Sequence, residues 1–561
     1  MLLSFAYENS MPSHVLSASA VPHTCIRVAS VPLLTDVHDR ALTVARCGMR
    51  MMWARSPMRR TIPRWLRHLS GSAAGTCGAD AGTDASEHVG CRVQTLMLGG
   101  PPLQLQLGGS IAGEELAVKF ARWTPQRPAG SAPAPTIVIC PSMSNNAFAA
   151  SATDEDGTPV AGWWDAVVGH GSQYGIDLDR FDVLCAAPLG SPHGALSPLT
   201  RRGAAEAEAE AEAEAEAEAD EATLVARPRW GPDFPQITPF DQATILLRLL
   251  DHPSVSVGHV HGVVGGSMGG MTALAFAMLA PHRWSRLVGI ATTGHTSPST
   301  VALRSVQRDA VLLDPEYRNG RYYAGDGGGA TGEGPLGGMA VARKVGTIGY
   351  RSRREFDERF DWSADEDSDS GSGTGAASSG AQMREAKFEV ESYLAHAAKK
   401  FAPSYDANCY LLLSRAMDLM DITKALQYSQ ADGSWDTEQR VPTPALDRAA
   451  RLRAAMAMIP SGREVMLLSY DLDALMPPDE AGELAATLGA LGKASVHYEV
   501  LPSKFGHDTF LIGAQAPPLR QRLGAFLHPG DDSEDDDHDG ERRPQRAVDR
   551  VRAVARGFTS E

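Results

Sequence analysis

Short apolar runs separated by glycine- and proline-rich turns begin near residue 92. Four of them, at 136–140, 181–185, 262–265 and 465–469, have the length of buried strands and lack strict polar alternation. Such runs are typical of parallel strands that are covered on both faces. Apolar residues at helical spacing fill the sequence between them, as in 241–250 (DQATILLRLL) and in 271–279. Strands that alternate with helices predict an α/β fold with a mostly parallel sheet flanked by helices.

A different pattern occupies residues 300–460. Strand signals vanish there and helical spacing dominates, for example over 385–400 and 409–426. Apolar strand runs return after this region. A helical insertion between early and late strands is the layout of a hydrolase core that carries a lid. We therefore expect a core formed by 91–299 and 461–527, with a lid at 300–460.

Three acidic segments differ in composition from this core. An Ala-Glu repeat within 201–222 would place like charges side by side in a helix or in a strand, so we expect a solvated insertion without a catalytic role. Residues 363–380 are rich in Ser, Gly and acid and predict a flexible linker, and 528–561 predicts a disordered, charged tail. The chain has 52 Lys and Arg against 68 Asp and Glu, a net charge of −16, and the acidic stretches 204–221, 363–380 and 531–541 alone contribute −21. The core is nearly neutral, so bulk charge says little about the substrate.

The N-terminal residues 1–90 form a separate region. Residues 41–79 contain seven arginines and no acidic residue, interleaved with Met, Trp, Ile and Leu. This composition predicts a transit peptide for a mitochondrion or a plastid. The alternatives are a disordered leader, or sequence upstream of a later start codon at Met49, Met51 or Met52, in a cytoplasmic protein.

Composition also excludes several classes of protein. Apolar residues make up 43% of the 561 residues, which excludes a chain that is disordered throughout. No stretch approaches eighteen consecutive apolar residues, which excludes a membrane-spanning helix. The seven cysteines are scattered and contain no CxxC pair, which argues against a disulfide framework or a structural zinc site. We expect no metal, no nucleic-acid partner and no membrane partner.

The pentapeptide 265–269 (GGSMG) fits the G-x-S-x-G pattern of a nucleophile. An apolar strand runs into it and a strong helix pattern leaves it, which is the strand-turn-helix setting of a nucleophile elbow. Glycines flank the serine because side chains would clash on so tight a turn, and the following helix directs its N-terminal amides at a developing oxyanion. We therefore predict Ser267 as the nucleophile. The alternative is a glycine-rich helix start without catalytic function.

A nucleophilic serine needs a base and a carboxylate that orients this base. Hydrolase cores of the α/β class supply the three residues in the chain order Ser, Asp or Glu, His. His507 follows the last predicted strand, 495–501, and is the predicted base. Asp471 and Asp473 both follow the strand at 465–469, and spacing alone does not separate them.

Several ordered segments resemble the homoserine O-acetyltransferase family of the α/β-hydrolase fold. The resemblance covers about residues 95–525 and rests on these segments: GGSMGGM at 265–271, GWWD at 162–165 with IDLDRF at 176–181, FPQIT at 234–238, DANCYL at 406–411 with RAMD at 415–418, DALMPP at 473–478 and GHDTFL at 506–511.

The resemblance assigns further roles. It favours Asp473 over Asp471 as the acid, because Asp473 begins the segment that matches the family. It implies that Arg343 and Tyr350 contact the amino-acid substrate, with the Arg343 guanidinium on its carboxylate, a contact that suits a planar fork. Spacing alone instead favours Arg343 as a solvated charge on a helix face. Asp508 is expected to bind the substrate ammonium.

The resemblance also places the oxyanion between two backbone amides, those of Met143 and Met268. Two segments nearby, 141–145 (PSMSN) and 187–198 (APLGSPHGALSP), depart from the family pattern. Both border the oxyanion and acyl-donor side of the pocket in the family, so the acyl group and the acceptor stay open.

The function that the resemblance implies is acyl transfer by a ping-pong mechanism. Acetyl-CoA, as co-substrate and not as a bound cofactor, would acylate Ser267, and L-homoserine would accept the acetyl group in methionine biosynthesis. The alternatives are serine O-acetyl- or O-succinyltransferase, homoserine O-succinyltransferase, an esterase of the same fold, or a non-catalytic interaction protein. The expected partners are small molecules, and the lid helices of the family suggest a homodimer.

Overall fold

The structure is a computed structural model that describes residues 90–128, 130–203, 228–323, 334–360, 388–429, 434–435 and 447–528. The predicted leader up to residue 89, the Ala-Glu repeat from 204, the linker at 363–380 and the tail from 529 lie outside these ranges. Within the described ranges, no helix is both long enough and apolar enough to cross a membrane.

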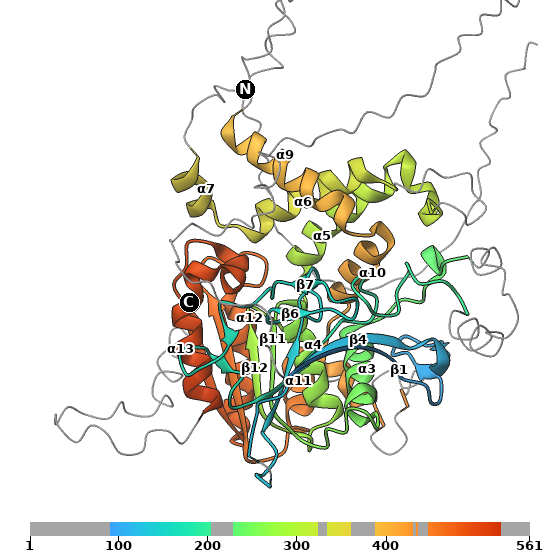
Figure 1. Ribbon diagram of the computed structural model, residues 1–561. Coiled ribbons are helices and arrows are strands. Elements are labelled where there is room, and N and C mark those ends of the chain that lie inside the picture. Colours follow the sequence, from blue (N-terminus) through green and yellow to red (C-terminus); the bar gives the residue numbers. More distant parts are fainter. Residues whose placement is uncertain are drawn as a thin grey trace, which may run out of the picture. The chain divides into compact units, whose positions relative to one another are not determined.

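An eight-stranded sheet forms the centre (Figure 1). Its strands, in spatial order, are β1 (Cys91–Met97), β4 (Ala117–Trp123), β10 (Asp182–Ala186), β5 (Thr136–Cys140), β11 (Val260–Gly266), β12 (Trp284–Ile290), β13 (Arg463–Tyr470) and β14 (Ala494–Leu501). The pairs β1–β4 and β4–β10 are antiparallel, and all later neighbours are parallel. Three short two-stranded pairs lie outside this sheet: β2 (Leu103–Gln104) with β3 (Ser110–Ile111), β6 (Ala152–Thr153) with β7 (Pro159–Val160), and β8 (Val168–Gly169) with β9 (Ile176–Asp177).

Helices cover both faces of the sheet, which is why its central strands are apolar without alternation. One face packs against α3 (Pro239–Asp251), α4 (Met268–Leu279), α11 (Arg448–Met456) and α12 (Pro478–Leu491). The other face packs against α13 (Ala516–Leu527), through residues such as Leu519 and Phe526. Val263 and Val264 are both fully buried, one in each of the two apolar cores.

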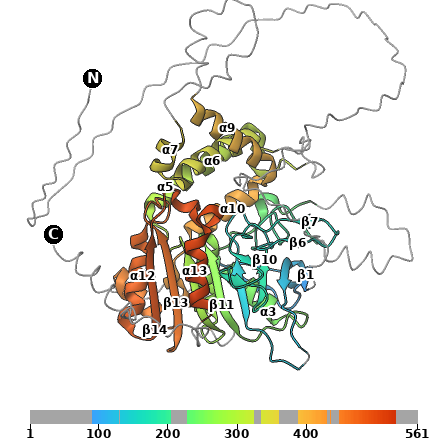
Figure 2. The ribbon, with the colours of Figure 1, turned by 60° about the vertical axis from the view of Figure 1, so that its left-hand side comes forward.

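The remaining helices lie over the carboxyl ends of the parallel strands (Figures 1 and 2). They are α5 (Pro298–Leu312), α6 (Leu336–Tyr350), α7 (Arg353–Arg359), α9 (Glu389–Phe401) and α10 (Ala407–Asp418). Short 3-10 turns connect these elements: η2 (Gly113–Glu115), η3 (Gly231–Asp233), η4 (Pro315–Gly320), η6 (Ala402–Ser404), η7 (Ile422–Gln427), η8 (Gly506–Leu511) and η9 (Gly513–Gln515).

The predicted α/β fold with a mostly parallel sheet and flanking helices is confirmed. Each predicted strand lies within two residues of its place in the sheet at both ends. The single helix predicted over 409–426 is wrong, because α10 ends at Asp418 and η7 begins at Ile422. The interruption has a local cause: the Asp421 carboxylate accepts a hydrogen bond from the Thr423 amide at 3.0 Å and caps a new turn.

Candidate active site

Ser267 lies between β11 and α4 on a sharply bent backbone, with φ 54° and ψ −123°. A residue other than glycine rarely adopts a positive φ, and such strain persists only where the surroundings impose it. The flanking glycines make the turn possible, because a Cβ on Gly265 would overlap the backbone of Gly269, and one on Gly269 would overlap the carbonyl oxygen of Cys140. The serine is therefore presented at the carboxyl end of a central strand.

The structure brings Ser267, His507 and Asp473 together in one hydrogen-bonded chain. His507 Nε2 lies 2.9 Å from Ser267 Oγ, and His507 Nδ1 lies 2.8 Å from Asp473 Oδ2. All three residues are buried. Asp471 points elsewhere: its Oδ1 accepts a hydrogen bond from the Ser503 amide at 2.8 Å. Of the two carboxylates that spacing left open, the one that contacts His507 is Asp473.

The carboxylate of Asp473 is held in place by its own loop. Its Oδ1 accepts hydrogen bonds from the amides of Leu475 at 3.0 Å and Met476 at 2.8 Å, which leaves Oδ2 for the imidazole. Burial of His507 by itself lowers the pKa of the ring, but the charge and hydrogen bond of Asp473 outweigh it, so the pKa of His507 is raised above its ordinary value. This arrangement stabilises an imidazolium and fixes the tautomer that can accept a proton from Ser267.

The predicted oxyanion donors are two backbone amides. Met268 is the first residue of α4, where helix geometry supplies no carbonyl partner for the amide. Met143 follows β5 and lines the same pocket as Ser267, and its carbonyl accepts a hydrogen bond from Tyr405 Oη at 2.8 Å. The tyrosine thus anchors the segment that carries the Met143 amide.

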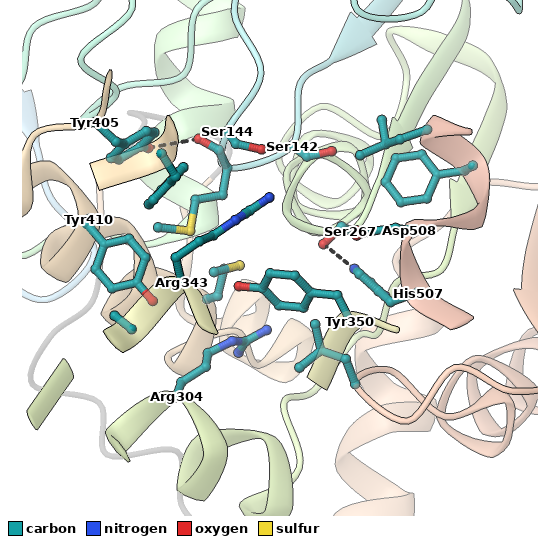
Figure 3. A pocket seen from close by; sticks show the side chains of 17 residues that line it. Ser142, Ser144, Ser267, Arg304, Arg343, Tyr350, Tyr405, Tyr410, His507 and Asp508 are labelled. Atoms are coloured by element: carbon teal, nitrogen blue, oxygen red, sulfur yellow. Dashed lines mark hydrogen bonds between the residues drawn. The ribbon is translucent and has the colours of Figure 1, made fainter. Parts of the chain in front are cut away.

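A cavity of about 70 Å³ extends from Ser267 to the helices above it (Figure 3). The core contributes Ser142–Ser144 and the turn at His507, and the covering helices contribute residues of α5, α6, α9 and α10. The predicted substrate contacts Arg343, Tyr350 and Asp508 all line this cavity. The guanidinium of Arg343 lies over the ring of Phe401, 4.8 Å from its centroid.

Comparison with known proteins assigns the chain to a family. Residues 227–514 match the model of the α/β-hydrolase fold family. The chain is 32% identical over 424 residues to a serine O-succinyltransferase of Litchfieldella anticariensis, and the match covers 75% of this chain and 96% of the relative. It is 30% identical over 389 residues to a homoserine O-acetyltransferase of Geobacter sulfurreducens (69% and 86% covered) and 30% identical over 414 residues to a homoserine O-succinyltransferase of Bordetella pertussis (73% and 82% covered).

The chain belongs to the homoserine O-acetyltransferase family. Solved structures share its fold: esterase E22 superposes with a TM-score of 0.57 at 20% identity, and a homoserine O-acetyltransferase from Bacillus anthracis with 0.56 at 18% identity. Each match covers 78% of this chain, with 100% and 98% of the respective structure. The relatives described above are named for different acyl groups and acceptors. Membership of the family therefore does not by itself identify the acyl donor or the acceptor.

One charged residue of the cavity was not predicted from the sequence. Arg304 of α5 lines the cavity and is only 3% exposed. The polarity of α5 is inverted: Thr300, Arg304 and Gln307 are buried while Val306 and Leu312 are exposed. Polar residues at helical spacing otherwise indicate a solvated face.

No group of three His, Cys, Asp or Glu side chains in the described ranges is arranged to hold a metal ion. The chemistry that the arrangement supports is nucleophilic attack by Ser267 on an acyl carbonyl, with His507 as the proton acceptor.

Proposed function

We propose that this family member transfers an acyl group from an acyl-CoA thioester to the hydroxyl group of an amino acid, with acetyl-CoA as donor and L-homoserine as acceptor. One observation carries the proposal: the hydrogen-bonded chain from Ser267 through His507 to Asp473 opens into a cavity that also holds Arg343 and Asp508. A nucleophile with its base, in a cavity that also holds a guanidinium and a carboxylate for the two charges of an amino acid, suits a zwitterionic acceptor.

The reaction proceeds in two halves. His507 takes the proton of Ser267 Oγ, which attacks the thioester carbonyl, and the amides of Met143 and Met268 stabilise the oxyanion. The C–S bond breaks, and the imidazolium returns its proton to the departing thiolate, leaving an ester on Ser267. The acceptor hydroxyl then gives its proton to His507 and attacks this ester, and Ser267 regains the proton as the product leaves. Asp473 stabilises the imidazolium in both halves.

The cavity wall supports the choice of an amino acid as the acceptor. The Arg343 guanidinium would receive its carboxylate and Asp508 its ammonium. Tyr350 also lies close to the base, with its ring centroid 6.3 Å from that of His507. Covering helices that keep water from the acyl-enzyme favour transfer over hydrolysis.

A second donor, succinyl-CoA, is favoured by one specific observation. The cavity contains a second guanidinium, that of Arg304, while a single amino-acid carboxylate requires only one. A dicarboxylic acyl group would supply the additional anion. The first relative described above is named a serine O-succinyltransferase, which keeps L-serine as the alternative acceptor.

The test measures CoA release by the purified full chain supplied with acetyl-CoA or succinyl-CoA and with L-homoserine, L-serine or water. Release that depends on L-homoserine supports the proposal. Equal release without any amino acid would indicate an esterase, and no release would favour a non-catalytic interaction protein. A Ser267→Ala variant that retained full activity would refute the mechanism.

We propose a homodimer that pairs through the covering helices. Val341 and Ile348 of α6 are 49% and 56% exposed, and Val306 and Leu312 of α5 are 55% and 51% exposed. Apolar side chains this exposed favour contact with a second copy. Ile348→Asp should shift the sedimentation coefficient to that of a monomer, whereas Leu107→Asp, at an exposed apolar residue beside β2, should not.

We also propose that the Arg-rich leader directs the protein to a mitochondrion or a plastid. The support is the seven arginines without an acid in 41–79. A reporter fused to residues 1–90 that stayed in the cytosol would refute the proposal, and import into either organelle would identify the location.

A further inference from the structure

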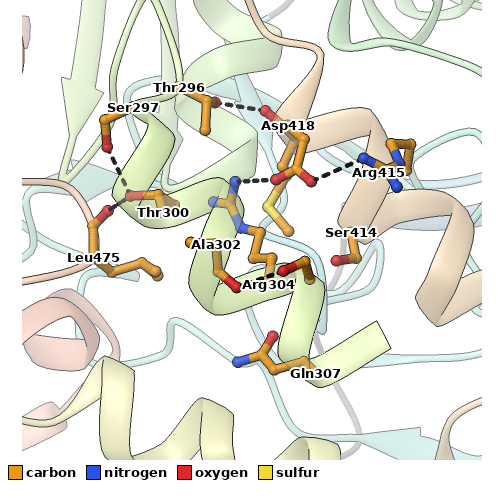
Figure 4. A network of polar contacts seen from close by, with 12 residues as sticks. Thr296, Ser297, Thr300, Ala302, Arg304, Gln307, Ser414, Arg415, Asp418 and Leu475 are labelled. Atoms are coloured by element: carbon orange, nitrogen blue, oxygen red, sulfur yellow. Dashed lines mark hydrogen bonds and ion pairs between the residues drawn. The ribbon is translucent and has the colours of Figure 1, made fainter. Parts of the chain in front are cut away.

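Asp418, the last residue of α10, is a carboxylate buried between guanidinium groups (Figure 4). Its Oδ1 lies 3.2 Å from Arg304 Nη1, and its Oδ2 lies 2.7 Å from Arg308 Nη2. The side chains of Asp418, Arg304 and Arg308 are 3–5% exposed. Arg415 approaches Oδ2 from outside at 3.6 Å, with a side chain that is 49% exposed.

The charges in this cluster do not balance. One buried carboxylate faces two buried guanidiniums, and an uncompensated buried cation costs considerable free energy. Arg308 satisfies a further donor through a hydrogen bond from Nη1 to Ser414 Oγ at 2.9 Å. Arg304 Nη2 and Arg308 Nη2 are both buried without a hydrogen-bond acceptor among the described residues, but Arg308 Nη2 lies 2.7 Å from Asp418 Oδ2 as an ion pair. The donor that stays unused is therefore Arg304 Nη2.

Arg304 is also the member of the cluster that lines the cavity containing Ser267, and Figure 3 shows its guanidinium directed toward Tyr350. A cation with an unused donor in the cavity of an acylated serine would bind an anion carried by the acyl group. Arg308 keeps Asp418 paired whether or not that anion is present.

Neighbouring hydrogen bonds fix the cluster relative to the catalytic residues. Thr300 of α5 donates to the carbonyl of Leu475 at 2.7 Å, in the loop that carries Asp473. Thr296 donates to the carbonyl of Met417, next to Asp418, at 2.6 Å. The guanidinium of Arg304 is thus held at a constant position relative to Ser267.

We propose that Asp418 is a positioning residue: it holds one side of the Arg304 guanidinium so that the other side binds the terminal carboxylate of a dicarboxylic acyl group on Ser267. This inference rests on the proposed acyl transfer and concerns its second donor, succinyl-CoA, whose selection over acetyl-CoA it assigns to a pair of residues. Asp418 itself touches no substrate.

The test compares kcat/KM for succinyl-CoA and acetyl-CoA, with L-homoserine as acceptor, in the full chain and in Asp418→Asn, Arg304→Gln and the double variant. We expect the succinyl-to-acetyl ratio to fall at least tenfold in each single variant. In the Arg304→Gln background, Asp418→Asn should change the ratio no further, because Asp418 acts through Arg304. Arg415→Gln is the matched control: it removes a cation from the same carboxylate without touching Arg304, and the ratio should stay constant.

Three results would overturn the inference: an equal loss for both donors in Asp418→Asn, a further change of the ratio in the Arg304→Gln background, or a wild-type protein that transfers acetyl but never succinyl groups. If Asp418→Asn fails to fold, Asp418→Glu retains the charge but displaces it by one methylene and should also lower the ratio. A wild-type protein that transfers neither group would instead refute the proposed function.

Discussion

Asp508 Oδ2 and Arg351 Nε lie 3.3 Å apart, and this ion pair connects the turn that carries His507 to the segment between α6 and α7. Both side chains are about one-fifth exposed, so the pair is accessible from the cavity and yet shielded from bulk water. Asp508 thus has a fixed orientation next to His507, as a group that binds an ammonium requires.

Asp508→Asn should raise the KM for the amino-acid acceptor about tenfold to a hundredfold, because a charge-assisted hydrogen bond contributes roughly 1.5–3 kcal/mol. The measurement is steady-state kinetics with varied L-homoserine at saturating donor. Glu358→Gln is the control, since Glu358 also contacts this turn, through Lys504 at 2.8 Å, but lies outside the cavity. An unchanged acceptor KM would exclude Asp508 from ammonium binding.

The decrease of kcat/KM at low pH should follow the protonation of His507. The base must be neutral to accept a proton, and its pKa is raised, so kcat/KM should fall with decreasing pH around a midpoint above the ordinary histidine value of about 6.5. Asp473→Asn removes the main contributions that raise this pKa and leaves only the charge of Asp508, while burial still lowers it, so the midpoint should move to lower pH and the rate should drop by about 10⁴. Asp471→Asn, whose carboxylate contacts Ser503 instead, should leave the midpoint in place.

Phe401→Leu should raise the acceptor KM about twofold to thirtyfold. The ring of Phe401 supports the Arg343 guanidinium, and such cation–π contacts contribute roughly 0.5–2 kcal/mol. Phe360→Leu is the matched control, because Arg359 stacks on Phe360 at 5.1 Å outside the cavity. Equal kinetic effects of the two variants would argue against a binding role for Arg343.

Gly269→Ala should destabilise the fold by about 1–3 kcal/mol, since the new methyl group would overlap the carbonyl oxygen of Cys140 on the neighbouring strand. Gly489→Ala in α12 meets open space and should instead be neutral or stabilise by up to about 1 kcal/mol. Urea denaturation of both variants measures the difference. A Gly269→Ala protein with wild-type stability would show that the elbow can relax.

The sequence predicted those parts of the structure whose signals are local. Apolar runs such as 136–140 identify central strands because burial on both faces demands them, and the glycines around Ser267 mark a turn that only small residues allow. The ordered motifs also led to the three residues of the hydrogen-bonded chain. Spacing left Asp471 and Asp473 equivalent, and the family motif favoured Asp473. The path of the loop after β13 agrees, because it brings Asp473 to His507 and Asp471 to the Ser503 amide.

The covering helices were harder to interpret because their polar sides face inward. Arg304 and Arg308 have the spacing of a solvated helix face, yet both are buried against Asp418, about 110 positions further along the chain. Only the tertiary pairing of α5 with α10 reveals this. The break between α10 and η7 also went unpredicted: besides the local cap at Asp421, the carbonyl of Gly294 accepts the Ile422 amide, a contact that spacing along the chain does not show.

The contacts between residues 351–358 and the His507 turn couple the entry of solvent into the cavity to the alignment of the His507 imidazole. Arg351 holds Asp508, Ser352 Oγ donates to the carbonyl of Lys504, and Glu358 holds the Lys504 ammonium. A displacement of this segment that admitted solvent would also release the turn that holds the imidazole in line with Ser267. Water arriving at an acyl-enzyme would then meet a misaligned base, so an open molecule would be a poor hydrolase as well as a poor transferase.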